Sequence, residues 1–145
     1  MSRIGLLYAI GAAVSWGITY TIDEKLLRSA SPLVLIAIHG AINLGLALPL
    51  LLVFEERSAL VGLAQDKTWL GLLIGAQILG VAANYCILAA ISALGASTAS
   101  IFEIAYPLFV VLFSWLAYGS LPHPSAWFGG ALILIGSAII IRGSH

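Results

Sequence analysis

The fold is decided by one apolar stretch, residues 93 to 119, which reads ALGASTASIFEIAYPLFVVLFSWLAYG. It is long enough to span a bilayer, because about 20 apolar helical residues cover the hydrocarbon core. It nevertheless carries a carboxylate, Glu103, followed closely by Tyr106 and Pro107. A charge inside the membrane costs about 2.5 to 3.5 kcal/mol on insertion scales. We therefore expect other helices to supply polar partners for Glu103.

The composition of the whole chain is that of an integral membrane protein. Of its 145 residues, 61% are hydrophobic and only 8% are charged, whereas soluble domains carry roughly 25% charged residues. A window of about 20 residues predicts an all-α bundle of five transmembrane helices. Their ranges are 4–22, 32–54, 68–91, 96–118 and 125–141.

These helices predict a single domain over residues 1–142, with 143–145 as a tag or linker remnant. Residues 55–67 are expected to form the one substantial loop. The sequence shows no metal-ligand spacing and no ordered set of catalytic residues. We therefore expect no enzyme activity, no metal, no cofactor and no nucleic-acid partner; membrane lipid surrounds the chain.

Polar and aromatic side chains inside the predicted helices are the candidates for a substrate or proton pathway. They are Ser15, Trp16, Tyr20, His39, Asn43, Gln77, Asn84, Glu103 and Tyr106. Such residues either bond a neighbouring helix or line a cavity, and the sequence leaves both open. Pro107 has no N–H to donate to the carbonyl of Glu103, so it is expected to kink the helix beside the carboxylate.

Four of these residues share one predicted depth. Ser15, His39, Asn84 and Glu103 each lie seven residues from a helix end on the same side of the membrane, or roughly 10 Å in. The shared layer predicts partners for Glu103. A buried carboxyl group with few partners resists ionisation, which is a property of proton-coupling residues. The alternative is a static hydrogen-bond network that only fixes helix register.

Small residues mark the expected helix contacts. They are Gly71, Gly75, Gly129, Gly130, Gly136 and Ser137. The last four form two pairs spaced seven apart, which make a continuous small-residue seam. The seam indicates a helix interface, within the chain or between chains.

Charged residues are expected at the helix ends. Residues 23–28 contain Asp23, Glu24, Lys25 and Arg28 and mark the first exit from the membrane, whereas His123 is expected in a solvated loop. One predicted side carries Arg3, Arg57 and Lys67, and the other carries Lys25, Arg28 and Arg142. This balance gives no positive-inside bias and permits both orientations in the membrane.

The order of short motifs resembles a single EamA-type repeat of the drug/metabolite transporter superfamily. The motifs are Trp16-Gly17, Ser31-Pro32-Leu33, Leu94-Gly95-Ala96-Ser97, Pro107-Leu108-Phe109, Ser114-Trp115, Gly119 with Leu121, and the glycine-rich last helix. Residues 84–141 are also similar to the last three helices of the small multidrug resistance transporters. Those relatives carry their membrane carboxylate on the first helix, near the position of Trp16, whereas this chain carries it at Glu103.

The resemblance implies a transporter in the prokaryotic cytoplasmic membrane that exports small organic metabolites or drug-like compounds. Larger members contain two inverted five-helix repeats, so this chain would be one half of an inverted-repeat transporter. It would work as an antiparallel homodimer of dual topology by alternating access. Glu103 would couple transport to protons, while Trp16, Tyr20 and Tyr106 would stack on the substrate. The alternatives are an uncoupled facilitator or exchanger, and a non-transporting helper or lipid-handling subunit.

Overall fold

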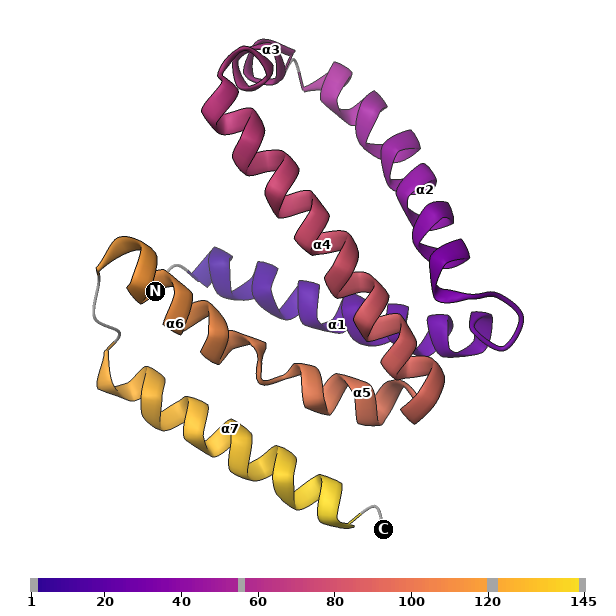
Figure 1. The fold of residues 1–145 in the computed structure, drawn as a ribbon, viewed down its shortest axis with the longest axis vertical. Helices are drawn as coiled ribbons and strands as arrows, with labels where there is room; N and C mark the ends of the chain where they lie inside the picture. The colour runs from indigo at the N-terminus through magenta and orange to yellow at the C-terminus, as the bar shows by residue number, and fades with distance from the viewer. Residues whose placement is uncertain (1–2, 55–56, 120–122, 144–145) are drawn as a thin grey trace. The chain divides into compact units, whose positions relative to one another are not determined.

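The structure, a computed structural model, describes residues 3–54, 57–119 and 123–143. This part of the chain is all-α, with seven helices and no strand (Figure 1). The helices are α1 (Arg3–Leu26), α2 (Pro32–Val53), α3 (Arg57–Gln65), α4 (Lys67–Leu94), α5 (Ala96–Glu103), α6 (Tyr106–Tyr118) and α7 (Pro124–Gly143). Leu121 and residues 144–145 of the predicted tag remnant lie outside the described residues.

Four stretches are long and apolar enough to cross a membrane. They are α1, α2, α4 and the span Ala96–Tyr118, which contains α5 and α6. The apolar part of α7, Trp127–Ile140, is shorter. The prediction of an all-α protein built from long apolar helices is confirmed.

Residues at the helix ends explain where α2 begins and α6 stops. The Ser31 hydroxyl accepts a hydrogen bond from the Val34 N–H at 3.4 Å, and Pro32 occupies the first helical position of α2. Both are preferred at a helix start. Gly119 adopts a left-handed conformation with φ of 65°, and its N–H donates to the Trp115 carbonyl at 2.8 Å. A left-handed glycine is a common helix terminator.

The start of α7 gives His123 a capping role that the sequence did not reveal. His123 is exposed, in keeping with a loop position, but its Nδ1 accepts the N–H of Ser125 at 3.3 Å. The Ser125 hydroxyl lies 2.8 Å from the same nitrogen. The imidazole thus takes the place of the usual serine or aspartate oxygen at a helix N-terminus.

The segment predicted as a loop contains a nine-residue helix, α3. The prediction of a loop over residues 55–67 was wrong because a search for apolar runs of about 20 residues does not register so short a helix. Asp66 separates α3 from α4: its Oδ1 accepts the N–H groups of Thr68 at 2.9 Å and Trp69 at 3.3 Å. These bonds satisfy free donors at the start of α4.

The stretch predicted as one helix over residues 96–118 is divided into α5 and α6 by a tightened turn at Ile104 and Ala105. Both residues keep right-handed helical dihedrals, with ψ near zero at −11° and −16°. The Leu108 N–H donates to the Ala105 carbonyl at 3.1 Å, three residues back. Pro107, the second residue of α6, cannot donate to the Glu103 carbonyl.

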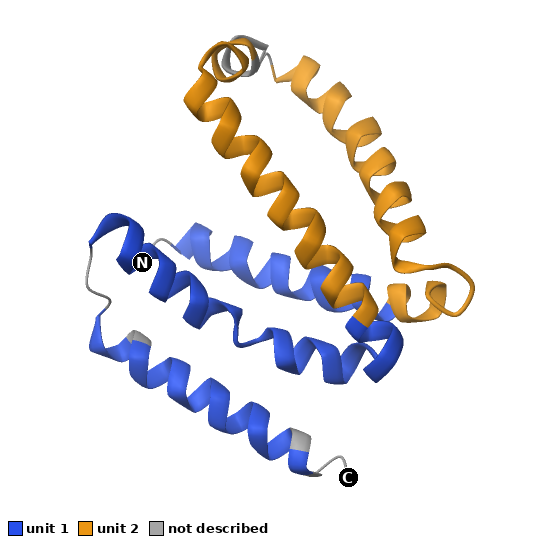
Figure 2. Cartoon of the chain, viewed as in Figure 1, with its two compact units in different colours: residues 1–21, 90–145 blue, residues 22–89 orange. Residues whose placement is uncertain are grey.

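The chain divides into two compact units (Figure 2). Unit 1 consists of residues 1–21 and 90–145, and unit 2 of residues 22–89. In unit 1, α7 packs against α5 and α6, and Ile91 and Ala99 are buried. In unit 2, Leu35 and Leu88 are buried.

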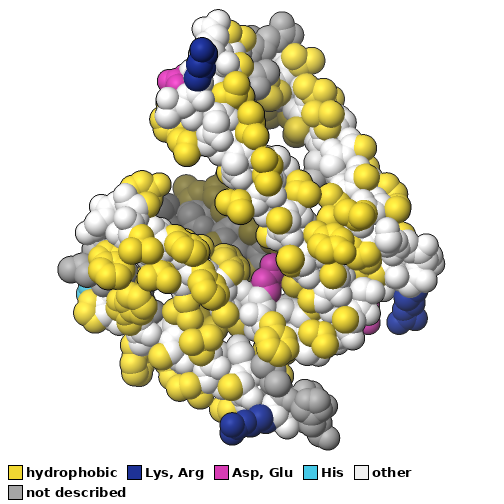
Figure 3. Space-filling model, viewed as in Figure 1, with side chains coloured by type: hydrophobic (Ala, Val, Ile, Leu, Met, Phe, Trp, Pro, Cys, Tyr) yellow, Lys and Arg dark blue, Asp and Glu magenta, His cyan; other side chains and the backbone are white. Residues whose placement is uncertain are grey.

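Large apolar side chains remain exposed along every membrane-length helix. Hydrophobic side chains cover most of the face seen in Figure 3, and few charged groups interrupt them. This distribution suits helices surrounded by lipid, where the hydrocarbon replaces a protein core as the apolar environment.

Candidate functional site

The Glu103 carboxylate lies at the end of α5, immediately before the turn that divides α5 from α6. The Tyr20 hydroxyl, from α1, donates a hydrogen bond to Glu103 Oε2 at 2.7 Å. Both residues belong to unit 1, and both side chains are partly buried. This distance is typical of a hydroxyl that donates to an oxygen acceptor. The contact joins two helices that are far apart in the sequence.

An aromatic pair extends this contact along α1. Trp16 lies one helical turn before Tyr20, and their ring centroids are 5.6 Å apart with the planes tilted by 50°. Trp16 is also exposed, so its indole is available to another molecule. The carboxylate, the phenol and the indole therefore form one continuous site, which we call the Glu103 site.

The other predicted pathway residues have local or exposed positions. The Asn84 side chain donates to the Gly80 carbonyl of its own helix at 2.9 Å, and the Ser15 carbonyl accepts the Thr19 hydroxyl at 2.9 Å. The remaining exposed members are Asn43, Gln77 and Tyr106. The hydrogen-bond partner of Glu103 is thus Tyr20, a residue expected only to stack on substrate. The four-residue layer remains a prediction.

A second polar pair lies in unit 2. His39 Nε2, from α2, is 3.5 Å from Oδ1 of Asp23, near the end of α1. The sequence placed Asp23 among charges marking the membrane exit, but its side chain is only 4% exposed. Its neighbours Lys25 and Arg28 are exposed, in line with the prediction. The burial of Asp23 was missed because it lies within a run of charges, and its contact with His39 in the next helix cannot be read from that run.

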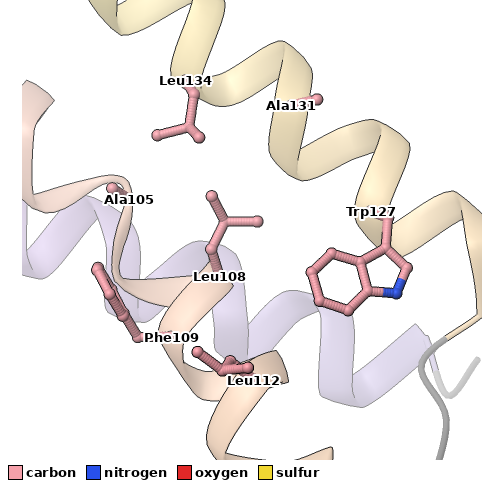
Figure 4. Close-up of a pocket in the computed structure, with 7 residues that line it drawn as sticks. All are labelled: Ala105, Leu108, Phe109, Leu112, Trp127, Ala131 and Leu134. Carbon is pink, nitrogen blue, oxygen red and sulfur yellow. The ribbon is translucent and has the colours of Figure 1, made fainter.

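An apolar pocket of about 360 Å³ lies between α6 and α7 in unit 1 (Figure 4). Its lining residues are Ala105, Leu108, Phe109, Leu112, Trp127, Ala131 and Leu134. Apart from the general apolar character of both helices, no sequence pattern predicted this pocket. Because every lining residue is apolar or aromatic, the pocket suits a hydrocarbon group rather than an ion.

The small residues of α7 divide into a packed and an open face. Gly130 is buried beside Leu108, and a Cβ atom at residue 130 would overlap the Leu108 side chain. The Ser137 hydroxyl donates to the Ile133 carbonyl at 2.9 Å and lies 3.4 Å from that of Ile101 in α5. The other predicted packing glycines have no neighbour within 4 Å of an added Cβ: Gly71, Gly75, Gly129 and Gly136.

Among the described residues, no group of three or more histidine, cysteine, aspartate or glutamate side chains comes together in a way that could hold an ion.

Long apolar helices with polar pairs between them define an integral membrane protein. The family model of the EamA-like transporter family matches residues 3–142, so the chain belongs to this family. It is therefore a membrane transporter of small molecules. Neither a search of curated proteins nor a search of solved structures found a significant match.

Proposed function

We propose that this chain exports small organic metabolites or drug-like compounds, working as an antiparallel homodimer by alternating access, with Glu103 as its proton-coupling residue. Membership of the EamA-like family supports transport. The observation that carries the coupling role is the hydrogen bond from Tyr20 to Glu103 in unit 1.

The protonation state of Glu103 is linked to the contact between α1 and α5. An ionised carboxylate accepts a strong, charge-assisted hydrogen bond from the Tyr20 hydroxyl. A protonated carboxyl group has no charge to strengthen that bond, so proton binding weakens the contact. Proton binding at Glu103 would thereby change how firmly α1 is held to α5.

The turn between α5 and α6 would allow a change in the contact between α1 and α5 to move one of these helices. Glu103 is the last residue of α5, and Ile104 and Ala105 follow without forming part of either helix. A helix interrupted beside its ionisable residue can pivot there, as discontinuous helices do at the binding sites of other transporters. Trp16 and Tyr20 would offer aromatic faces to an organic substrate beside the same carboxylate.

A second copy of this chain is the partner that we propose. We take residues 1–142 as one five-helix repeat in which α5 and α6 together make the fourth crossing and α7 makes the fifth. An inverted second copy would complete the inverted-repeat architecture that alternating access uses. Two features support this arrangement: the balanced Lys and Arg count on the two sides, and the unoccupied Gly129 and Gly136 face of α7.

The coupling role can be tested with purified protein in liposomes under an imposed pH gradient. Ethidium serves as the drug-like probe and radiolabelled amino acids as metabolite probes. We expect the wild type to move at least one probe faster with the gradient than without it. Glu103→Gln should lose this stimulation while keeping exchange at equal pH, because the amide cannot release a proton.

The other outcomes separate the alternatives. Gradient-driven transport that is unchanged in Glu103→Gln would exclude Glu103 as the coupling residue and favour an uncoupled facilitator or exchanger. No probe transport by the wild type, together with a less stable Glu103→Gln variant, would favour a helper subunit.

The apolar pocket between α6 and α7 favours a second candidate, lipid handling. It is lined only by apolar and aromatic side chains, as an acyl chain requires. Scrambling of a fluorescent phospholipid across the liposome membrane by the wild type, in place of probe transport, would support this candidate over export.

A further inference from the structure

We propose that Asp23 and His39 together bind one proton and form a second proton site of the chain, in unit 2. The site shares no residue with the Glu103 site, although α1 contributes to both: Tyr20 to the Glu103 site and Asp23 to this one. Its use in transport rests on the proposed function, whereas proton binding by the pair does not.

The geometry of the pair suits a shared proton. His39 Nε2 and Asp23 Oδ1 are 3.5 Å apart, so a protonated imidazole can point its Nε2–H at the carboxylate oxygen. Imidazolium and carboxylate together carry no net charge. When the proton leaves, one negative charge remains on a carboxylate that the chain almost fully covers. A buried, uncompensated carboxylate is costly, so Asp23 needs a partner that can carry a positive charge.

The two partners differ in exposure, which defines a route for the proton. The His39 side chain is 38% exposed, whereas the Asp23 side chain is only 4% exposed. A proton can therefore reach and leave the imidazole, while the carboxylate behind it remains shielded. Histidine is suited to this role because its charge changes within the physiological pH range.

Among the described charged and titratable groups of unit 2, His39 is the one that forms an ion pair with Asp23. On the same end of α1, Lys25 and Arg28 are exposed, and Glu24 adds a carboxylate next to Asp23. Within α2, His39 is the titratable side chain. In α4, the Tyr85 and Cys86 side chains are exposed. Asp66, which lies immediately before this helix, is exposed as well. The described ion pair of Asp23 is the one with His39.

Proton binding at this pair would act on the connection between the end of α1 and the start of α2. Asp23 lies in the last turn of α1, and His39 lies two turns into α2. A protonated His39 attracts Asp23 and holds the two helices together, whereas loss of the proton removes that attraction. The same event therefore changes both the charge and the strength of the helix contact.

Diethyl pyrocarbonate tests proton binding directly. Of the two forms of a histidine side chain, it modifies the unprotonated imidazole and not the imidazolium. The background chain carries His123→Gln and His145→Gln, so that the modification of His39 can be followed alone by mass spectrometry. At pH 6.5 we expect Asp23→Asn to be modified at least threefold faster than the background chain, since the asparagine no longer stabilises the imidazolium. Equal rates would overturn the proposal.

A pH series separates protonation from a loss of structure. If Asp23 acts through the proton, the two rates converge as the pH rises towards 9, where the imidazole is neutral in both chains. A constant rate ratio at every pH would mean that the variant merely exposes His39, and would overturn the proposal. Asp66→Asn is the matched control. It removes one carboxylate from an exposed position, the asparagine can still cap α4, and the rate should not change.

The role of the Asp23–His39 pair in transport is tested separately, by measuring probe transport in liposomes. We expect Asp23→Asn and His39→Gln to lose at least half of the stimulation by a pH gradient, whereas the control Asp66→Asn should retain it. Full stimulation in both variants would remove the pair from the transport cycle. Absence of transport in the wild type would instead contradict the proposed function, and the labelling experiment would still decide whether the pair binds a proton.

Discussion

At the scale of single residues, the contact of Tyr20 with Glu103 makes a stability prediction. Tyr20→Phe removes the hydroxyl and leaves the ring, so the carboxylate loses the donor recorded at 2.7 Å. Hydrogen bonds between membrane helices are worth about 0.6 to 2 kcal/mol. Because this bond involves an acid, we expect a loss of about 1 to 2 kcal/mol in the free energy of unfolding, measured by denaturation in detergent micelles.

Tyr118→Phe provides the matched control, because the Tyr118 side chain is 82% exposed. It should change stability by less than about 0.5 kcal/mol. A double-mutant cycle with Glu103→Gln should show that the effect of Tyr20→Phe shrinks when the acid is absent. Equal effects in both backgrounds would mean that Tyr20 stabilises the chain through its ring instead.

Neighbouring glycines of α7 predict opposite responses to the same substitution. In Gly130→Ala the new methyl group would overlap the Leu108 side chain, which must then move within the contact between α6 and α7. Overpacking of this kind costs about 1 to 3 kcal/mol. Gly129→Ala meets nothing within 4 Å and should be neutral or stabilising by up to about 1 kcal/mol, as expected from helix propensity. Unfolding in detergent measures both, and equal values would contradict the packing of α7.

Residue types and spacing identified the polar side chains within the apolar helices, but not how they pair. Glu103, His39 and Tyr20 are each unusual inside apolar helices and were recognised as such. Their partners depend on the rotation of each helix about its axis, which spacing along one helix does not determine. Asp23 illustrates this limit, since its burial and its contact with His39 distinguish it from the exposed charges beside it.

At the scale of helices, Pro107 and Pro49 show why a proline alone does not predict a break. Pro49 lies inside α2, which continues through it to Val53, whereas the chain is interrupted just before Pro107. Apolar periodicity and length predicted the long helices closely. They gave one helix over residues 96–118, whereas the missing N–H of Pro107 predicted the interruption beside Glu103 that divides α5 from α6.

Pro107→Ala should join α5 and α6 into one helix. The alanine supplies the N–H that can donate to the Glu103 carbonyl, which restores the regular bonding pattern across Ile104 and Ala105. We expect slower hydrogen exchange of the amides at residues 104–108, by tenfold or more, and slower probe transport. Pro49→Ala is the control and should leave exchange at residues 104–108 unchanged. Unaltered exchange in Pro107→Ala would show that another constraint maintains the turn.

At the scale of the whole molecule, the open face of α7 predicts how two copies meet. Gly130 and Ser137 are used inside the chain, against Leu108 and the Ile101 carbonyl. Gly129 and Gly136 have room beside them, and small residues allow two membrane helices to approach closely. We expect this face to contact α7 of an inverted copy, with the crossing point midway between the two glycines.

Cysteine crosslinking distinguishes the two orientations. In a chain with Cys86→Ala, Gly129→Cys and Gly136→Cys are made separately and then co-expressed. Two antiparallel helices that cross midway bring residue 129 of one copy to residue 136 of the other, so the mixture should crosslink and each variant alone should crosslink weakly. Parallel helices would give crosslinks in both single variants, because each position then meets itself. One antiparallel crossing cannot bring both the 129–129 pair and the 136–136 pair together. Crosslinks in both single variants would therefore exclude the inverted homodimer, but would not contradict membership of the transporter family.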